Sequence, residues 1–317
     1  MDDGAAARDS GLPADPAVPA LHAIAQHGLD ATLRRLGLEP PFDEVSLLKH
    51  HVARRCTFAF RAAGRPLVAK AHCVDVSGQA ELLTALERHG LAGGRPPTAP
   101  RLVACDAGLR LIVTERLDGE RGTGLIRRGA RVGELAAGWL ARQWNAPIDI
   151  GPLYDSSAYL ERLERNGAVV SEAAPELARA VGAVLEALAR CPPAMRDPVL
   201  SHGSFGVGHI VDMGAGAGVV DWDGFAQSRP ELDVATFLAT LAREAGGNPD
   251  LELPAARAAG AFRAAVAPVV DHTALAWYEA GARLRNARHL CVGRPVAWAA
   301  RAERLLAEAR LLVGAGT

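Results

Sequence analysis

Segment 200–223, LSHGSFGVGHIVDMGAGAGVVDWD, combines a polar turn, two short apolar runs around a glycine-rich stretch, and two closely spaced carboxylates. Asp221 ends the second apolar run, where a carboxylate is well placed to bind Mg²⁺, a hard cation that takes oxygen ligands. Asp223 is either a second ligand or a turn cap, because Asp-Gly sequences favour turns in general. This order of elements is typical of sites that transfer phosphoryl groups.

A lysine supplies the second candidate group. The chain has 35 Lys plus Arg residues, and only Lys49 and Lys70 are lysines. Lys70 lies in an apolar, strand-like run, which indicates a need for a compact ammonium there. Paired with Glu81 on the helix predicted to follow, it could hold the α- and β-phosphates of a nucleotide. The alternative interpretation is an edge-strand lysine and a helix-surface glutamate.

Two regions of different character must position these groups. Residues 20–36 have helical spacing, short links then predict a meander of strands, and a helix with Ser77 at its start interrupts the series. The predicted strands are 44–52, 56–62, 66–72, 101–106 and 109–115, and the helix covers 77–89. Residues 118–129 are polar and glycine-bearing, which suits a linker.

After residue 132 the apolar residues recur every three or four positions, which predicts helices. The expected helices are 133–144, 157–166, 174–190, 233–245, 255–266, 273–292 and 295–312, with one hairpin of strands 210–213 and 218–220. We therefore predict an α+β fold with a flexible tail at residues 1–19. A sheet-plus-helix lobe follows at 20–118, and a mainly helical lobe carries the catalytic-type loop at 119–317.

Composition excludes several classes of protein. The chain has 317 residues, is 49% hydrophobic and has a net charge of -1, which argues against a general nucleic-acid binder. No apolar run reaches the length of a membrane span, and the acidic N-terminus does not resemble a signal peptide. Five scattered cysteines without a C-x-x-C pair favour reduced thiols, so we expect a cytoplasmic protein.

The segments HGSFGVGH (202–209), VDWDGF (220–225) and RPELDVA (229–235) resemble the aminoglycoside phosphotransferase family, which includes choline kinase-like proteins. The family pattern is H-G-D, an N five positions after that D, a D-W-D-like segment, and a D-P-x-x-D-[LIV]-A element. The resemblance covers residue 44 to the C-terminus and implies a protein kinase-like bilobal fold. The first lobe would be a five-stranded antiparallel sheet with one helix.

The resemblance implies a role for each matching residue. Lys70 and Glu81 would bind the phosphates of ATP or GTP, and the backbone near Glu115 and Leu117 would bind the base. His202 would brace the catalytic loop and Asp221 would hold Mg²⁺. Asp233 would anchor the loop backbone as a structural residue.

Two residues depart from the family pattern. Ser204 occupies the position of the catalytic aspartate, and His209 that of the metal-binding asparagine. A serine hydroxyl is a poor base at neutral pH, and losing a general base typically costs about 10²–10⁴ in rate. A neutral histidine prefers softer metals than Mg²⁺. Asp223 is the residue that could replace the missing base.

Three hypotheses follow. The protein is an ATP-dependent phosphotransferase acting on a hydroxyl of a small molecule or peptide, with Ser204, His202 and Asp223 at the reacting centre. Alternatively it is a catalytically impaired pseudokinase that binds a nucleotide or a protein partner. In the third, His202, His209, Asp221 and Asp223 form a transition-metal site. Neither a nucleic acid nor a membrane is expected as a partner.

Overall fold

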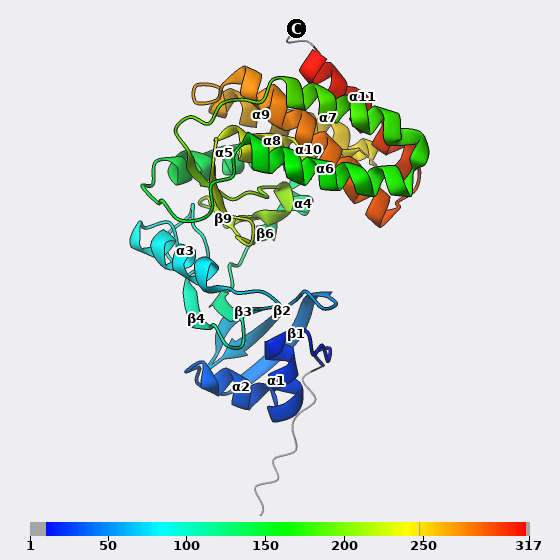
Figure 1. The fold of residues 1–317 in the computed structure, drawn as a ribbon. Coiled ribbons are helices and arrows are strands. Elements are labelled where there is room, and N and C mark those ends of the chain that lie inside the picture. The colour runs from blue at the N-terminus through cyan, green and yellow to red at the C-terminus, as the bar shows by residue number, and fades with distance from the viewer. Residues whose placement is uncertain (1–10, 247, 315–317) are drawn as a thin grey trace, which may run out of the picture. The chain divides into compact units, whose positions relative to one another are not determined.

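A computed structural model describes residues 11–246 and 248–314. The chain divides into two compact units, the first ending at Asp118 and the second beginning at Gly119 (Figure 1). Each unit is described separately below.

The first unit is built on a five-stranded antiparallel sheet with the order β1-β2-β3-β5-β4. Its strands are β1 (Phe42–His51), β2 (Arg55–Ala62), β3 (Arg65–His72), β4 (Leu102–Asp106) and β5 (Leu111–Glu115). The link between β2 and β3 is Ala63-Gly64, and both residues have positive φ, 47° and 79°. That conformation matches the twist of a two-residue hairpin, which explains the meander that the sequence predicts.

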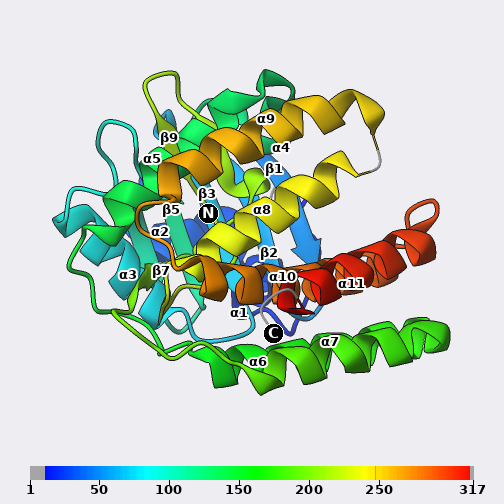
Figure 2. The same ribbon diagram turned by 90° about the horizontal axis from the view of Figure 1, so that it is seen from above.

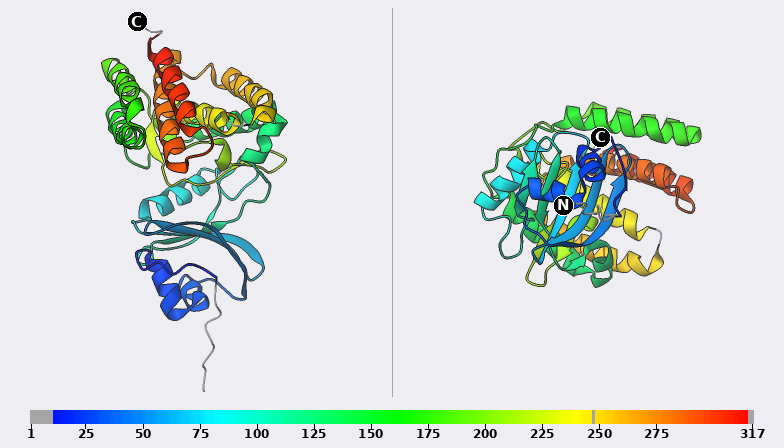
Figure 3. Two further views of the ribbon diagram at one scale, coloured as in Figure 1. Left: turned by 90° about the vertical axis from the view of Figure 1, so that its right-hand side faces the viewer. Right: turned by 90° about the horizontal axis from the view of Figure 1, so that it is seen from below.

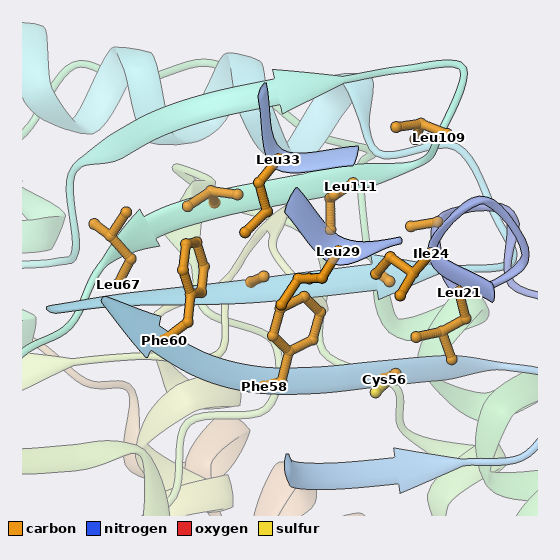
Figure 4. Packing of buried hydrophobic residues seen from close by; sticks show 14 of the residues in the cluster. Leu21, Ile24, Leu29, Leu33, Cys56, Phe58, Phe60, Leu67, Leu109 and Leu111 are labelled. Atoms are coloured by element: carbon orange, nitrogen blue, oxygen red, sulfur yellow. The ribbon is translucent and has the colours of Figure 1, made fainter. Parts of the chain in front are cut away.

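Two helices cover one face of this sheet, α1 (Pro19–His27) and α2 (Leu29–Arg35). Figure 4 shows Leu29 and Leu33 of α2 over Phe58 and Phe60 of β2, and Leu21 of α1 beside Cys56. The helical spacing of residues 20–36 belongs to two helices. Gly28, with φ 84°, turns the chain between the two helices so that both lay their apolar residues on the sheet.

Successive residues of β3 point to opposite faces. Leu67, Ala69 and Ala71 belong to the core under α1 and α2, so Lys70 points to the other face. The helix α3 (Ser77–Arg88) lies on that other face, as Figure 3 shows. The strand alternation therefore places Lys70 on the side of the sheet where α3 lies.

The predicted flexible tail, residues 1–19, is only partly covered by the structure, since residues 1–10 lie outside the described part. Of residues 11–18, Asp15 and Val18 are buried. The carboxylate of Asp15 contacts His50 Nε2 at 2.9 Å and accepts from the Ala53 N–H at 2.8 Å, which ties this residue to the end of β1 and the turn after it. The flexibility of the tail stays a prediction.

The second unit is mainly helical and confirms the predicted α+β class (Figure 2). Helices α6 and α7 pack on each other, and α10 packs against α6, α8 and α11. The elements are α4 (Gly122–Leu125), α5 (Ala130–Trp144), α6 (Ser156–Ala173), α7 (Ala178–Arg190), β7 (Val199–Ser201), β8 (Ile210–Asp212), β9 (Ala217–Val219), β10 (Ala226–Ser228), α8 (Glu231–Ala245), α9 (Pro249–Val266), α10 (His272–Gly293) and α11 (Trp298–Gly314). Within the described ranges, no helix has the length and apolar character needed to cross a membrane.

The predicted linker at residues 118–129 is ordered instead. The short strand β6 (Glu120–Arg121) pairs with β8 and extends the hairpin of β8 and β9 to three strands. A Cβ on Gly122 would lie 1.3 Å from the Val207 carbonyl oxygen, so only glycine allows this approach. Residue 122 packs closely on the catalytic-type loop, and this packing requires the glycine that the sequence pattern attributes to a linker.

Candidate active site

The first unit holds the candidate phosphate-binding lysine in the middle of its sheet. Lys70 is half-buried on β3 and lies between Thr57 of β2 and Ile112 of β5 in register. Glu81 lies near the start of α3 with its side chain exposed. The sequence thus predicts correctly that Lys70 is a sheet residue and that Glu81 lies on the helix that follows. Their ion pair stays a prediction.

Glu115 and Leu117 stand where the chain leaves the sheet. Glu115 is the last residue of β5, its N–H donates to the Arg101 carbonyl at 3.0 Å, and its carboxylate pairs with Arg65 at 3.0 Å. The next N–H, of Arg116, donates to the Pro66 carbonyl. The N–H groups of Glu115 and Arg116 are thus already hydrogen-bonded to the backbone. Leu117 is half-buried and lies beyond β5, so it is a better candidate than Glu115 for contacting the base of a nucleotide.

In the second unit, the N-terminal turn of α8 holds the catalytic-type loop. The carboxylate of Asp233 accepts the backbone N–H of His202 at 2.6 Å and that of Gly203 at 3.0 Å. The side chain is fully buried, and this burial raises the pKa of Asp233 to about 6, against the opposing effect of its hydrogen bonds. Asp233 therefore lies where an anchor of the loop must lie.

Gln143 is a residue of this site that sequence reasoning missed. From α5, its fully buried amide Nε2 donates to the Leu200 carbonyl at 2.5 Å and to Asp233 Oδ2 at 3.3 Å. Trp139, four residues earlier on the same helix face, donates Nε1–H to Gln143 Oε1. A glutamine inside an otherwise apolar helix stripe was the available signal, because such a side chain needs buried partners.

His202 and Ser204 form a hydrogen-bonded pair. His202 Nε2 lies 3.0 Å from the Val220 carbonyl oxygen, which can only accept, so Nε2 carries the hydrogen. In the neutral ring Nδ1 is then an acceptor, and it lies 3.2 Å from Ser204 Oγ. The Ser204 hydroxyl therefore donates to His202. This geometry joins a hydroxyl to a buried base through one hydrogen bond.

Gly203 allows the tight turn between these two residues. Its φ is 73°, and a Cβ at this position would lie 1.9 Å from the Gly224 carbonyl oxygen. Both facts exclude a side chain. The loop and the segment after Asp223 are therefore in direct backbone contact.

Asp221 and His209 also meet. Asp221 Oδ2 lies 3.5 Å from His209 Nε2, and the His209 ring stacks on the His202 ring with centroids 5.1 Å apart. Asp221 has φ 73°, an uncommon conformation for a residue other than glycine, and such outliers concentrate at functional sites. Ser204, His202, His209 and Asp221 thus form one continuous network.

Asp223 is exposed to solvent, in contrast to the half-buried Asp221. Within the described ranges, no three His, Cys, Asp or Glu side chains come together as a metal site. In addition, both ring nitrogens of His202 already contact the Val220 carbonyl and Ser204. The hypothesis of a four-residue transition-metal site is therefore wrong for this structure.

Comparison with known proteins agrees with this geometry. The model of a family described as "Phosphotransferase enzyme family" matches residues 57–278. The chain belongs to this phosphotransferase family. The resemblance found in the sequence is thus confirmed, and the matched residues include Lys70, the whole catalytic-type loop and Asp233. Curated protein sequences give no match.

Solved structures show the same fold. Aminoglycoside phosphotransferase APH(4)-Ia is similar with a TM-score of 0.63 and 15% identity, over 92% of this chain and 99% of that chain. A choline/ethanolamine kinase family protein from Mesorhizobium loti gives 0.55 and 17%, over 92% and 94%. Aminoglycoside-3'-phosphotransferase of type VIII gives 0.57 and 20%, over 82% and 99%. The protein kinase-like fold is therefore confirmed.

Proposed function

We propose that the protein transfers the γ-phosphoryl group of ATP, or of GTP, to a hydroxyl group of a small molecule or peptide. The observation that carries the proposal is the loop network, in which Asp233 fixes the backbone of His202 and Gly203 while Asp221 stands at the end of the hairpin beside His209. A thermostable mutant of APH(4)-Ia has been crystallised with ADP and hygromycin B, which supports a nucleotide and a small acceptor.

The nucleotide is assigned to residues of the first unit. Lys70, as a compact cation in a sheet, suits the α- and β-phosphates, and Glu81 would orient it. The backbone at Leu117 and Glu115 would contact the base. These roles rest on position in the family pattern and on the places of the residues in the sheet and on α3.

Mg²⁺ is assigned to Asp221. Mg²⁺ in kinase-type sites is usually held by one or two carboxylates together with substrate phosphates and water, so one aspartate in a strained backbone position fits it. When bound, the ion would neutralise charge on the transferred phosphoryl group. His209 would act mainly through its contact with Asp221, because an imidazole is a poor ligand for this metal.

Ser204 and His202 are proposed to replace the missing aspartate. A proton leaving the acceptor hydroxyl would pass to Ser204 Oγ, while the Ser204 proton moves to His202 Nδ1 along the 3.2 Å hydrogen bond. The charge that forms on the imidazole would be shared with the Val220 carbonyl through Nε2–H. Since phosphoryl transfer has a loose transition state, this weak base can suffice.

The pair is tested with two substitutions. His202→Gln keeps an amide that can donate to the Val220 carbonyl but removes the base, and Ser204→Asp supplies a carboxylate directly. We expect His202→Gln to lower ATP turnover by about 10²-fold or more in the wild-type chain. It should have a much smaller effect in a chain that already carries Ser204→Asp. Equal losses in both backgrounds would show that His202 acts only through loop structure.

A second candidate function is a pseudokinase that binds a nucleotide or a protein partner. The observation that favours it is the neutral hydroxyl of Ser204 at the position of the family's catalytic carboxylate. Nucleotide binding is measured by thermal shift with and without Mg²⁺, and turnover is measured with hydroxylated small molecules and peptides. Stabilisation by ATP without turnover for any acceptor, but with turnover after Ser204→Asp, would establish the pseudokinase.

Asp223 is the remaining candidate base. Its exposure leaves it accessible to substrate. If Asp223→Asn abolishes turnover while Ser204→Ala leaves it unchanged, the base is Asp223 and the role proposed for Ser204 is wrong. Asp221→Ala should abolish turnover whether the base is Ser204 or Asp223.

A further inference from the structure

Arg285, in the middle of α10, is a buried cation without a counter-charge among the residues that the structure describes. Its side chain is 7% exposed. In the part of the chain that the structure describes, Arg285 forms no ion pair with a carboxylate, and its buried Nε has no hydrogen-bond partner. Leaving a buried charge unpaired is expensive, and native proteins rarely do so without a function.

The groups around Arg285 make the imbalance larger. Burial lowers the pKa of Arg285, and the nearby charges of Arg162 on α6 and Arg243 on α8 lower it further. The phenol of Tyr159 acts in the opposite direction and raises the pKa of Arg285, but burial raises the pKa of Tyr159 itself and keeps the phenol neutral. The pKa of His289, one turn later on α10, is also lowered, first by burial and then by Arg243 and Arg285. The local potential is therefore positive.

A second unpaired donor lies on α6, the helix that packs on α10. Tyr159 donates to the Tyr278 carbonyl, and a Cβ on Gly281 would lie 2.6 Å from Tyr159 and 2.7 Å from Leu163. Asn166 lies one turn after Leu163 on α6, and Arg285 lies one turn after Gly281 on α10. Asn166 is 8% exposed, and its buried Nδ2 has no hydrogen-bond partner among the described residues.

The α8 side contributes a paired cation. Arg243 Nη1 lies 3.4 Å from Asn286 Oδ1, and its Nη2 pairs with Glu244 at 2.7 Å. Glu244 thus compensates Arg243, and Arg162 and Arg285 remain uncompensated in the described chain. His289, one turn after Arg285 on α10, is partly exposed to solvent.

We propose that Arg285, together with Arg162 and Asn166, binds a small oxyanion such as a phosphate group. An oxyanion supplies the two things that these residues lack. It brings a negative charge, and its lone pairs accept hydrogen bonds from the unpaired Arg285 Nε and Asn166 Nδ2. The proposal does not depend on phosphotransferase activity.

Inorganic phosphate is the probe, titrated against chloride at constant ionic strength and followed by calorimetry and thermal unfolding. The wild-type chain should bind phosphate and gain stability with its concentration. Arg285→Met should weaken phosphate binding at least tenfold. In chloride alone it should leave the unfolding temperature unchanged or higher, because the variant no longer buries an unpaired charge. The matched control is Arg165→Met, on α6 and exposed, which should bind phosphate like the wild type.

His289 gives an independent readout. Since a bound anion cancels part of the positive potential, the pKa of His289, followed by NMR, should rise when phosphate is added to the wild type and not when it is added to Arg285→Met. The proposal is overturned if phosphate binds equally to both chains. It is also overturned if the wild type shows no phosphate binding and Arg285→Met is less stable in chloride, because Arg285 would then be satisfied within the fold.

Glycerol 3-phosphate distinguishes the sources of the anion. If glycerol 3-phosphate binds at least tenfold tighter than inorganic phosphate and this binding is lost in Arg285→Met, the phosphate belongs to a larger hydroxylated ligand. If glycerol 3-phosphate and inorganic phosphate bind with equal affinity, and Arg285→Met loses both, the site takes the free ion.

Discussion

Replacing Asp233 by asparagine tests how the catalytic-type loop is held. The side chain keeps its size but can no longer ionise. In the folded chain the pKa of Asp233 is raised from 3.8 to about 6, mainly by burial. A group with a raised pKa binds its proton more tightly in the folded state, so its contribution to stability falls as the pH rises through this range.

The expected size follows from the pKa difference. A shift of one pKa unit corresponds to about 1.4 kcal/mol, so the whole effect is about 3 kcal/mol, and about 2 kcal/mol of it falls between about pH 4.5 and about pH 7.5. The wild type loses this amount with rising pH, and the variant does not. The free energy of unfolding of Asp233→Asn, relative to wild type, should therefore improve by about 2 kcal/mol over that interval.

Urea unfolding followed by tryptophan fluorescence measures this difference. All five tryptophans lie after residue 118, so the signal reports the unit that contains the loop. Asp223→Asn, at an exposed position of the same unit, is measured in parallel as the matched control. If the Asp233→Asn difference worsens with rising pH, the hydrogen bonds from His202 and Gly203 outweigh burial, and the reasoning is wrong.

Two further predictions concern the backbone and the nucleotide. Gly203→Ala should destabilise the second unit by about 2 kcal/mol or more in the same urea assay, because it forces a side chain into a positive-φ position against the Gly224 carbonyl. An unchanged midpoint of urea unfolding would show that the loop can relax. Lys70→Met should abolish stabilisation by ATP in a thermal-shift assay while leaving the unfolding temperature without nucleotide within a few degrees. If ATP still stabilises this variant, the phosphates are held elsewhere.

Local patterns predicted the elements well where neighbouring residues decide the structure. The five strands and α3 follow from apolar runs divided by short turns such as Ala63-Gly64. The family spacing from His202 to Asp233 correctly predicted a loop held by a carboxylate. By contrast, residues 11–18 looked like a tail, because the partner of Asp15 is His50, 35 positions away.

The sequence by itself determined the family and the fold class, and it predicted which residues stand at the positions of the active site, since all three depend on residue type and spacing. Only the tertiary structure decided what those residues contact. It joins Ser204 to the acceptor nitrogen of His202 and places Gln143 against Asp233. It also buries Arg285 without a carboxylate partner in residues 11–246 and 248–314. The physical reason is that hydrogen-bond and charge partners come from distant segments, and their cost or benefit depends on burial that no local pattern encodes.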